Sequence, residues 1–358
     1  MPNKFRIIFQ PLDTYFFGAE NVIPGTDTTN YILKSLAFPR PSTVLGILRY
    51  LLLYSNPNLF DGQTITNKIE AAKRIGEKTF DPLSPDFDMG IIRKIGPLHL
   101  IRYQPIPSNR FEKTAMFQAG IRTPEICFND KLEFIGGYAN WKEKDYKSQD
   151  SDGLVFGTEN GTREYLNAEN IFLQRFLTNN HKQKTDREDA FYKTQFRMLA
   201  PEYAFCVEMD LLENIQLPET LHLKMGGENR LFRFAIVPSE TSVNLSPLLE
   251  DFRQTSACLS IAVSDVLLDR LPDSAYRLTR VATARALQSS VQTRSYTTRT
   301  RSGGTGVLST TKRFDLLEAG SAFYFQTRQK QLEFIQQLDE KPGLQQAGWN
   351  HFIHFENK

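Results

Sequence analysis

The chain has 358 residues and a formal net charge of only +2, with 40% hydrophobic residues that include 27 phenylalanines. This length suits two medium domains, or one large domain with insertions, and the apolar content can fill substantial cores. The longest apolar run, Val44 to Tyr54, is too short to cross a bilayer, and the first residues lack the apolar run of a signal peptide. These features exclude a membrane-spanning or secreted protein and predict a cytoplasmic one. The three cysteines fit no metal spacing and are expected to be reduced and buried: Cys127, Cys206 and Cys258.

The first part of the chain follows the order strand, helix, strand. Lys4 to Gln10 alternates apolar and polar residues, which predicts a strand. Pro39 to Thr43 precedes apolar residues at helical spacing, which predicts a helix with Ser42 or Thr43 as its N-cap. A second helix is expected over Thr66 to Ile75, before a strand that begins near Leu98. These connection lengths favour a split βαβ arrangement over a large parallel sheet.

The middle of the chain contains two polar segments, Lys142 to Asp152 and Asn179 to Asp189, with little to bury. Both are expected to be insertions or the tips of projecting hairpins. The elements expected after them are strands over 191–199 and 203–211, a tight glycine loop over 225–230, a strand over 231–237, a short helix over 246–252, strands over 258–263, 278–287 and 322–325, and a closing helix over 328–338. The strand–helix–strand order recurs in the second half, so two α+β domains are predicted.

The sequence contains no recognisable catalytic or metal-binding motif. His351 and His354 could share one helical face, but no third ligand pattern accompanies them, and His99 beside an apolar run is typical of a core histidine. A nucleophile elbow and a zinc-protease motif are missing. Gly304-Thr305-Gly306 lacks the third glycine of a dinucleotide fingerprint. We therefore predict that the protein is not an enzyme and binds no cofactor and no metal.

The most distinctive feature is the segment from Ser274 to Arg313, the basic stretch, which has eight Lys or Arg residues and no Asp or Glu. Positive charge concentrated on a nearly neutral chain suits a polyanion, and the glycines of its loop Arg301 to Gly306 can expose backbone amides to phosphate. Guanidinium groups, hydroxyls and one aromatic ring occur together at Arg294, Tyr296, Arg299 and Arg301, a combination typical of RNA binding. A merely solvated basic surface is the alternative interpretation.

A second phosphate site is predicted at the start of the first helix. Ser42 and Thr43 would lie at its N-terminus, where the helix dipole favours anions, with Arg40 and Arg49 on either side. The alternative is a capped helix with solvated arginines.

Several segments in chain order resemble one protein family. They are Pro11 to Phe17, Pro41 to Arg49, Ile95 to Leu98, Ala190 to Met198, Met225 to Leu231, and Thr311 to Arg313 leading to Glu318 to Phe325. Together they resemble the third Cmr subunit of type III-B CRISPR effector complexes, a member of the RAMP superfamily of RNA-binding proteins. Ser289 to Gln292 departs from this pattern, because family members often have Gly-Trp-Asp there.

The resemblance implies an α+β fold of two ferredoxin-like (RRM-like) domains with long insertions, including a β-hairpin thumb. The domains would cover residues 1–200, with insertions at about 105–195, and 201–358, with the glycine-rich basic loop. It further implies a non-catalytic subunit in antiviral defence that binds the 5′ handle of the CRISPR guide RNA. Its expected partners are the large polymerase-like subunit, a backbone subunit and other Cmr subunits, and indirectly the target RNA, with no membrane involved.

The predicted RNA site combines the positions that match the family with those of the basic stretch. The matching positions are Arg40, Ser42, Thr43, Gly46, Arg49, Gly226, Gly227 and Arg230. The basic stretch adds Arg294, Tyr296, Arg299, Arg301, Gly303, Gly304, Lys312 and Arg313.

Two other functions fit the same sequence. Some RAMP proteins cut precursor CRISPR RNA with a histidine general base, and here His99 or His181 would have to serve. The third possibility is a protein-only assembly module whose insertions bind neighbouring subunits.

Overall fold

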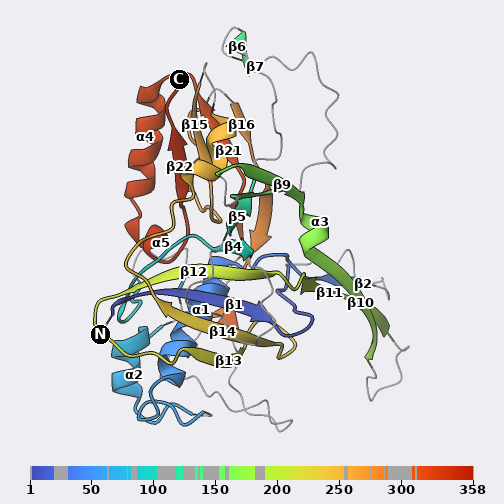
Figure 1. The fold of residues 1–358 in the computed structure, drawn as a ribbon, viewed down its shortest axis with the longest axis vertical. Helices are drawn as coiled ribbons and strands as arrows, with labels where there is room; N and C mark the ends of the chain where they lie inside the picture. Colours follow the sequence, from blue (N-terminus) through green and yellow to red (C-terminus); the bar gives the residue numbers. More distant parts are fainter. Residues whose placement is uncertain are drawn as a thin grey trace.

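The computed structural model describes residues 2–19, 31–62, 64–78, 80–81, 87–102, 118–123, 134–135, 138–139, 153–157, 161–181, 190–253, 257–274, 276–285, 287–288, 309–310 and 313–357. Figure 1 shows two main sheets placed one after the other along the long axis, with a hairpin that projects to one side. Helices accompany mixed sheets, so the predicted α+β class is confirmed. Within the described residues, no helix has the length and apolar character that crossing a membrane requires.

The first sheet has nine strands, and its paired strands run antiparallel. The order is β13 (Thr220–Lys224), β14 (Leu231–Pro238), β1 (Lys4–Pro11), β12 (Tyr203–Leu211), β4 (His99–Arg102), β5 (Gln118–Arg122), β8 (Gly153–Gly157) and β9 (Arg163–Asn167), with β3 (Ile92–Ile95) also paired to β12. Strands β12 to β14 therefore belong with β1, and the chain passes from the first main sheet to the second between Pro238 and Cys258.

The core of this sheet follows from the alternation in β1. Phe5, Ile7 and Phe9 are buried in one cluster with the leucines of helix α1 (Pro41–Tyr54), while Ile8 is buried in a separate cluster. The Phe9 ring stacks between two neighbours, with centroids 5.3 Å from Phe205 and 5.5 Å from Phe234. Burying one such ring contributes about 1.5–3 kcal/mol.

Helix α1 forms at the predicted place, but its N-cap prediction was wrong. The helix begins at Pro41, Arg40 occupies the N-cap position, and no side chain caps the first turn. Ser42 and Thr43 lie inside that turn because proline, which has no N–H to satisfy, takes the first helical position. Helix α2 (Lys68–Ile75) does have a capping side chain, since Asn67 accepts a hydrogen bond from the Glu70 N–H at 3.2 Å.

The projecting hairpin consists of β10 (Phe172–His181) and β11 (Ala190–Leu199), which pair antiparallel over their whole length. Helix α3 (Ala168–Ile171) leads into it, and β2 (Tyr31–Lys34) runs parallel to β11 (Figure 1). The predicted hairpin is thus confirmed. Its tip at residues 182–189 lies outside the described residues, as does the whole of the other polar segment, Lys142 to Asp152. The short pair of β6 (Phe134–Ile135) and β7 (Tyr138–Ala139) precedes that segment in the chain.

The second sheet has the order β16 (Tyr276–Leu278), β21 (Ala322–Phe325), β15 (Cys258–Ala262) and β22 (Phe352–Phe355), all antiparallel. Helix α4 (Arg328–Asp339) packs on one face through Phe334, whose ring centroid lies 5.3 Å from that of Phe323. The opposite face packs on η1 (Ser246–Phe252), a 3-10 helix, and on Val155 of the first sheet. Helix α5 (Pro342–Gln346) connects α4 to β22.

Two smaller strand pairs extend from the second sheet. β17 (Val281–Ala284) pairs with β20 (Phe314–Leu317), and β18 (Leu287–Gln288) pairs with β19 (Ser309–Thr310). The predicted strand over 278–287 is confirmed in β17. His351 and His354 do not share a helical face, because His354 lies in strand β22.

Candidate nucleic-acid interface

A cleft of about 600 Å³ lies beside the first turns of α1. Four segments meet there: the start of α1, the segment around Phe17, the turn Met225–Arg230 (the glycine turn), and Arg285 at the end of β17. Its polar and glycine lining consists of Gly18, Arg40, Ser42, Thr43, Gly46, Arg49, Tyr50, Gly62, Lys224, Gly226, Gly227 and Arg285. Among the described residues, none that lines it is Asp or Glu. This α1 cleft therefore favours an anionic ligand.

One side of α1 borders the cleft. Thr43, Gly46 and Tyr50 lie three and four residues apart, a spacing that places them on one helical face. Gly46 is exposed, and a Cβ built on it would have no atom within 4 Å. Glycine in a helix interior costs about 1 kcal/mol relative to alanine, and no packing contact with the described residues requires it here. The missing side chain keeps this wall of the cleft open.

The glycine turn closes the cleft from the other side. Gly226 has φ +77°, and the two following non-glycine residues Glu228 and Asn229 also have positive φ, at 59° and 53°. The Gly227 N–H donates to the Phe16 carbonyl at 2.8 Å, and a Cβ on Gly226 would come within 2.5 Å of that same oxygen. The turn therefore needs glycine for its own backbone and for its close packing on Phe16, whatever ligand the cleft takes.

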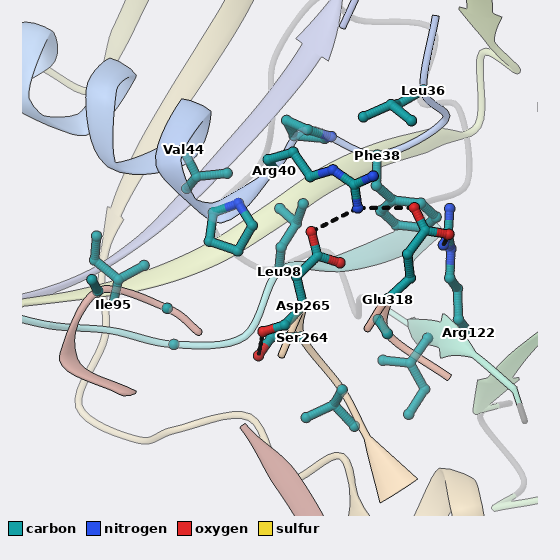
Figure 2. A pocket seen from close by; sticks show the side chains of 18 residues that line it. Leu36, Phe38, Arg40, Val44, Ile95, Leu98, Arg122, Ser264, Asp265 and Glu318 are labelled. Atoms are coloured by element: carbon teal, nitrogen blue, oxygen red, sulfur yellow. Dashed lines mark hydrogen bonds and ion pairs between the residues drawn. The ribbon is translucent and has the colours of Figure 1, made fainter. Parts of the chain in front are cut away.

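Arg40 borders the cleft but points its guanidinium into the contact between the two sheets. Its Nη1 donates to the Asp265 carboxylate at 2.9 Å and lies 2.8 Å from Glu318 Oε1 (Figure 2). Arg122 lies on the other side of Glu318 at 3.4 Å and stacks over the Phe38 ring at 4.7 Å. We call these four charged residues the junction cluster.

Burial and ion pairing compete at the carboxylates of the junction cluster. Burial alone would raise the pKa of Glu318, but Arg122 and Arg40 outweigh it, and the pKa lies below its usual value. Burial raises the pKa of Asp265 despite the opposing effect of Arg40. A small cavity of about 50 Å³ lies beside the cluster.

Two more predicted phosphate ligands have roles inside the protein. Arg49 is only 5% exposed and donates to the backbone carbonyls of Lys78 at 2.9 Å and Asp88 at 2.5 Å. The guanidinium of Arg230 stacks over the Phe196 ring at 4.4 Å. Their RNA contacts remain predictions, and the structure gives each arginine a stabilising contact of its own.

The basic stretch leads to the same cleft. Arg285, which lines the cleft, belongs to this stretch, and the exposed Arg313 lies just before β20. The other predicted positions lie outside the described residues: Arg294, Tyr296, Arg299, Arg301, Gly303, Gly304 and Lys312. At Arg285 the basic stretch thus borders the same cleft as the tip of α1, while the phosphate contacts predicted for both stay predictions.

Sequence reasoning missed three residues of this cleft: Tyr50, Lys224 and Arg285. Arg285 could have been selected as one of the eight cations of the basic stretch. Lys224 comes directly before the glycine turn, and Tyr50 follows Gly46 by about one helical turn.

Three of the described histidines, His99, His351 and His354, have ring contacts inside the protein. His99 is 2% exposed, one ring nitrogen lies 3.2 Å from the Pro97 carbonyl oxygen, and burial lowers its pKa to about 4. Burial also lowers the pKa of His351 and of His354 to about 4, and these rings bond to the Ile95 carbonyl and the Ser260 hydroxyl. The side chain of His181 lies outside the described part of the chain.

The described residues also test part of the cysteine prediction and include no candidate metal site. Cys206 and Cys258 are free and buried, as predicted, and burial raises the pKa of Cys206 to about 12; Cys127 lies outside the described residues. No group of three His, Cys, Asp or Glu residues in the described ranges could hold a metal ion.

Comparisons with known proteins identify the family. No curated protein matches the chain. Two chains of similar fold come from cryo-EM structures of Type III-B Cmr-beta bound to cognate target RNA, one of them also with AMPPnP (state 1). They are 14% and 12% identical, each with a TM-score of 0.46 over 97% of this chain and 96% of the other. The family model described as CRISPR-associated protein (Cas_Cmr3) matches residues 177–356, about half of the sequence. The chain therefore belongs to the Cas_Cmr3 family of CRISPR-associated proteins, in agreement with the resemblance found in its sequence.

Proposed function

We propose that this protein is a non-catalytic, RNA-binding subunit of a type III-B CRISPR effector complex, and that its α1 cleft binds the backbone of the guide RNA at the 5′ handle. The observation that supports this most directly is the convergence of α1, the glycine turn and the basic stretch on one cleft whose described lining carries four Lys or Arg residues and no acid. Membership of the Cas_Cmr3 family supports the CRISPR assignment. The large polymerase-like subunit and a backbone subunit are its proposed protein partners.

The chemistry of the cleft suits single-stranded RNA better than a small anion. Grooves that bind single strands combine cations along the backbone with aromatic rings on which bases stack. Four cations line the cleft, of which Arg40 belongs to the junction cluster and Arg49 is buried. The other two, Lys224 and Arg285, are exposed, and the half-buried Tyr50 supplies an aromatic ring. Ser42 and Thr43 add hydroxyl donors at the positive end of the helix dipole.

Catalysis receives no support from the described histidines. A general base must reach the proton that it removes. His99, one of the two candidates for an RNA-cutting relative, is 2% exposed and lies in the core. Guide RNA should therefore be recovered uncut after incubation with the purified protein.

We also propose that both main sheets are ferredoxin-like domains. In β14-β1-β12-β4 and in β22-β15-β21-β16, the strand that comes first in the chain lies between the third and the fourth, and all neighbours are antiparallel. This order is that of the split βαβ sandwich. The first unit has α1 in the place of the first helix, and the second has α4 in the place of the second.

The test is RNA affinity after removal of the two cleft cations. Fluorescence anisotropy would compare guide RNA that has its 5′ handle with RNA whose handle is scrambled, for the wild type and for Lys224→Ala/Arg285→Ala. Loss of two single-strand phosphate contacts lowers the salt slope by about 1.4 and the affinity roughly 20-fold at 0.1 M salt. The control Lys330→Ala/Lys341→Ala removes the same charge from α4 and from the residue just before α5. Equal affinity of wild type and cleft variant, or no preference for the intact handle, would contradict the proposal.

A further inference from the structure

Two carboxylates face each other between the sheets because of a short backbone pairing. Val266 and Leu317 exchange both backbone hydrogen bonds, at 2.7 and 2.9 Å. In an antiparallel pair this places their neighbours Asp265 and Glu318 opposite each other. Like charges at such positions repel, and both side chains are mostly buried, with 11% and 20% exposure. The pairing therefore requires cations, which Arg40 and Arg122 supply.

Glu318 is also tied to the strand that leads into the cleft. Its backbone N–H donates to the Arg280 carbonyl at 2.8 Å. The Ser321 hydroxyl donates to the Glu318 carbonyl at 2.8 Å and accepts from the Arg280 N–H at 3.1 Å. Arg280 directly precedes β17, and Arg285 directly follows it. These hydrogen bonds therefore hold the start of β17 beside Glu318, and β17 in turn leads to Arg285.

Arg40 joins this arrangement to α1. It occupies the N-cap position of the helix, and its carbonyl accepts hydrogen bonds from the Thr43 and Val44 N–H groups. It also borders both the α1 cleft and the small cavity beside the junction cluster. Its side chain is 14% exposed, with one nitrogen shared by two carboxylates (Figure 2). A phosphate would have to compete with two ion pairs already in place.

We infer that Arg40 is a positioning residue rather than a phosphate ligand: through Asp265 and Glu318 it holds the β17–β20 pair against α1, and so keeps Arg285 beside the α1 cleft. The effect on RNA affinity that follows from this inference rests on the proposed RNA-binding function. The structural part, a dependence of the β17–β20 position on the junction cluster, stands independently of RNA.

The sign of one substitution separates this inference from simple electrostatics. Glu318→Gln keeps the shape of the side chain and removes one negative charge close to the cleft. If Arg40 were a phosphate ligand restrained by carboxylates, the change would tighten RNA binding. If the cluster positions β17, the same change weakens binding roughly fivefold at 0.1 M salt and lowers the salt slope by about 0.7, as the phosphate contact of Arg285 is lost. Asp265→Asn is the second variant, with the same expected direction.

The control Glu333→Gln removes one negative charge from the exposed face of α4 and should leave RNA affinity within twofold of the wild type. Amide hydrogen exchange without RNA gives the structural readout, because loosening of β17 and β20 should raise exchange there at least tenfold while β1 and β12 stay protected. Tighter or unchanged RNA binding by both variants would overturn the inference. If the wild type itself fails to bind RNA, the proposed function fails, and unchanged exchange in β17 and β20 would then overturn the positioning role separately.

Discussion

Replacement of Gly46 by alanine should make the protein more stable and bind RNA less well. Alanine is favoured over glycine by about 1 kcal/mol in a helix interior. A Cβ at this position meets no atom within 4 Å, so the gain is not offset by a clash. A gain of this size raises the midpoint of thermal unfolding by a few degrees for a domain of this size.

The same methyl group should weaken RNA binding because it fills the open wall of the cleft. A closely packed contact that gains one methyl group loses about 1–3 kcal/mol, so Gly46→Ala should lower the affinity at least fivefold. Gly46→Leu, which projects further into the cleft, should abolish detectable binding. The two opposite effects come from one substitution, and a general loss of folded protein cannot produce both.

Thermal unfolding followed by circular dichroism and fluorescence anisotropy with handle-containing RNA measure the two effects. Gln336→Ala, at an exposed position of α4, is the control for helix propensity and should leave RNA affinity unchanged. A stable Gly46→Leu protein with wild-type affinity would refute the reasoning, because RNA could not then approach α1 at this residue.

Two further predictions concern stability. Arg49→Met should lower the free energy of unfolding by about 2–5 kcal/mol in urea titrations, since two backbone carbonyls lose the charged donor that the buried Arg49 supplies. The exposed Arg93→Met is the control, and a loss below about 1 kcal/mol would contradict this role. Acid should destabilise the protein between pH 6.5 and about 4, because the unfolded chain binds protons that the buried neutral rings of His99, His351 and His354 do not. Each ring adds a slope of up to about 1.4 kcal/mol per pH unit, lower for the partly exposed two, so stability is full above pH 6.5 and falls as the pH drops. His99→Gln should flatten the profile, and an unchanged profile would contradict this role of burial.

Elements with a strong local pattern could be predicted from the sequence. The alternation of Lys4 to Gln10 and the helical spacing after Pro41 both correspond to observed elements, as do the glycine turn and α4. Strand β22 was missed because a four-residue strand near the chain end has too few alternations to stand out from a frayed terminus. The short strands β5 and β8 lie in the region read only as insertions, yet they extend the first sheet.

The roles of the arginines could not be predicted, because they depend on partners far away in the chain. Arg40 pairs with Asp265, 225 residues later, and nothing in the local sequence around Arg40 indicates a carboxylate there. Arg49 was expected at the surface near phosphate, but its position on α1 turns it inward to two backbone carbonyls. The composition of the basic stretch was informative because a run without Asp or Glu can be seen directly in the sequence, whereas an ion pair between distant residues cannot.

Because several arginines contact other parts of the protein, fewer cations are left to contact RNA phosphates than the sequence alone suggests. Five cations that each neutralise one phosphate of a single strand would give a salt slope of about −3.5. The guanidinium groups of Arg40, Arg49 and Arg230 contact carboxylates, backbone carbonyls and an aromatic ring of the protein. Lys224 and Arg285 are the exposed cations in the described lining of the cleft, and one phosphate for each gives a slope of only about −1.4. A measured slope steeper than this requires further cations, and we predict that those of the acid-free basic stretch supply them. Arg294→Ala/Arg299→Ala/Arg301→Ala should then lower a steep slope by about 2, whereas a slope that stays the same would place those arginines away from the RNA.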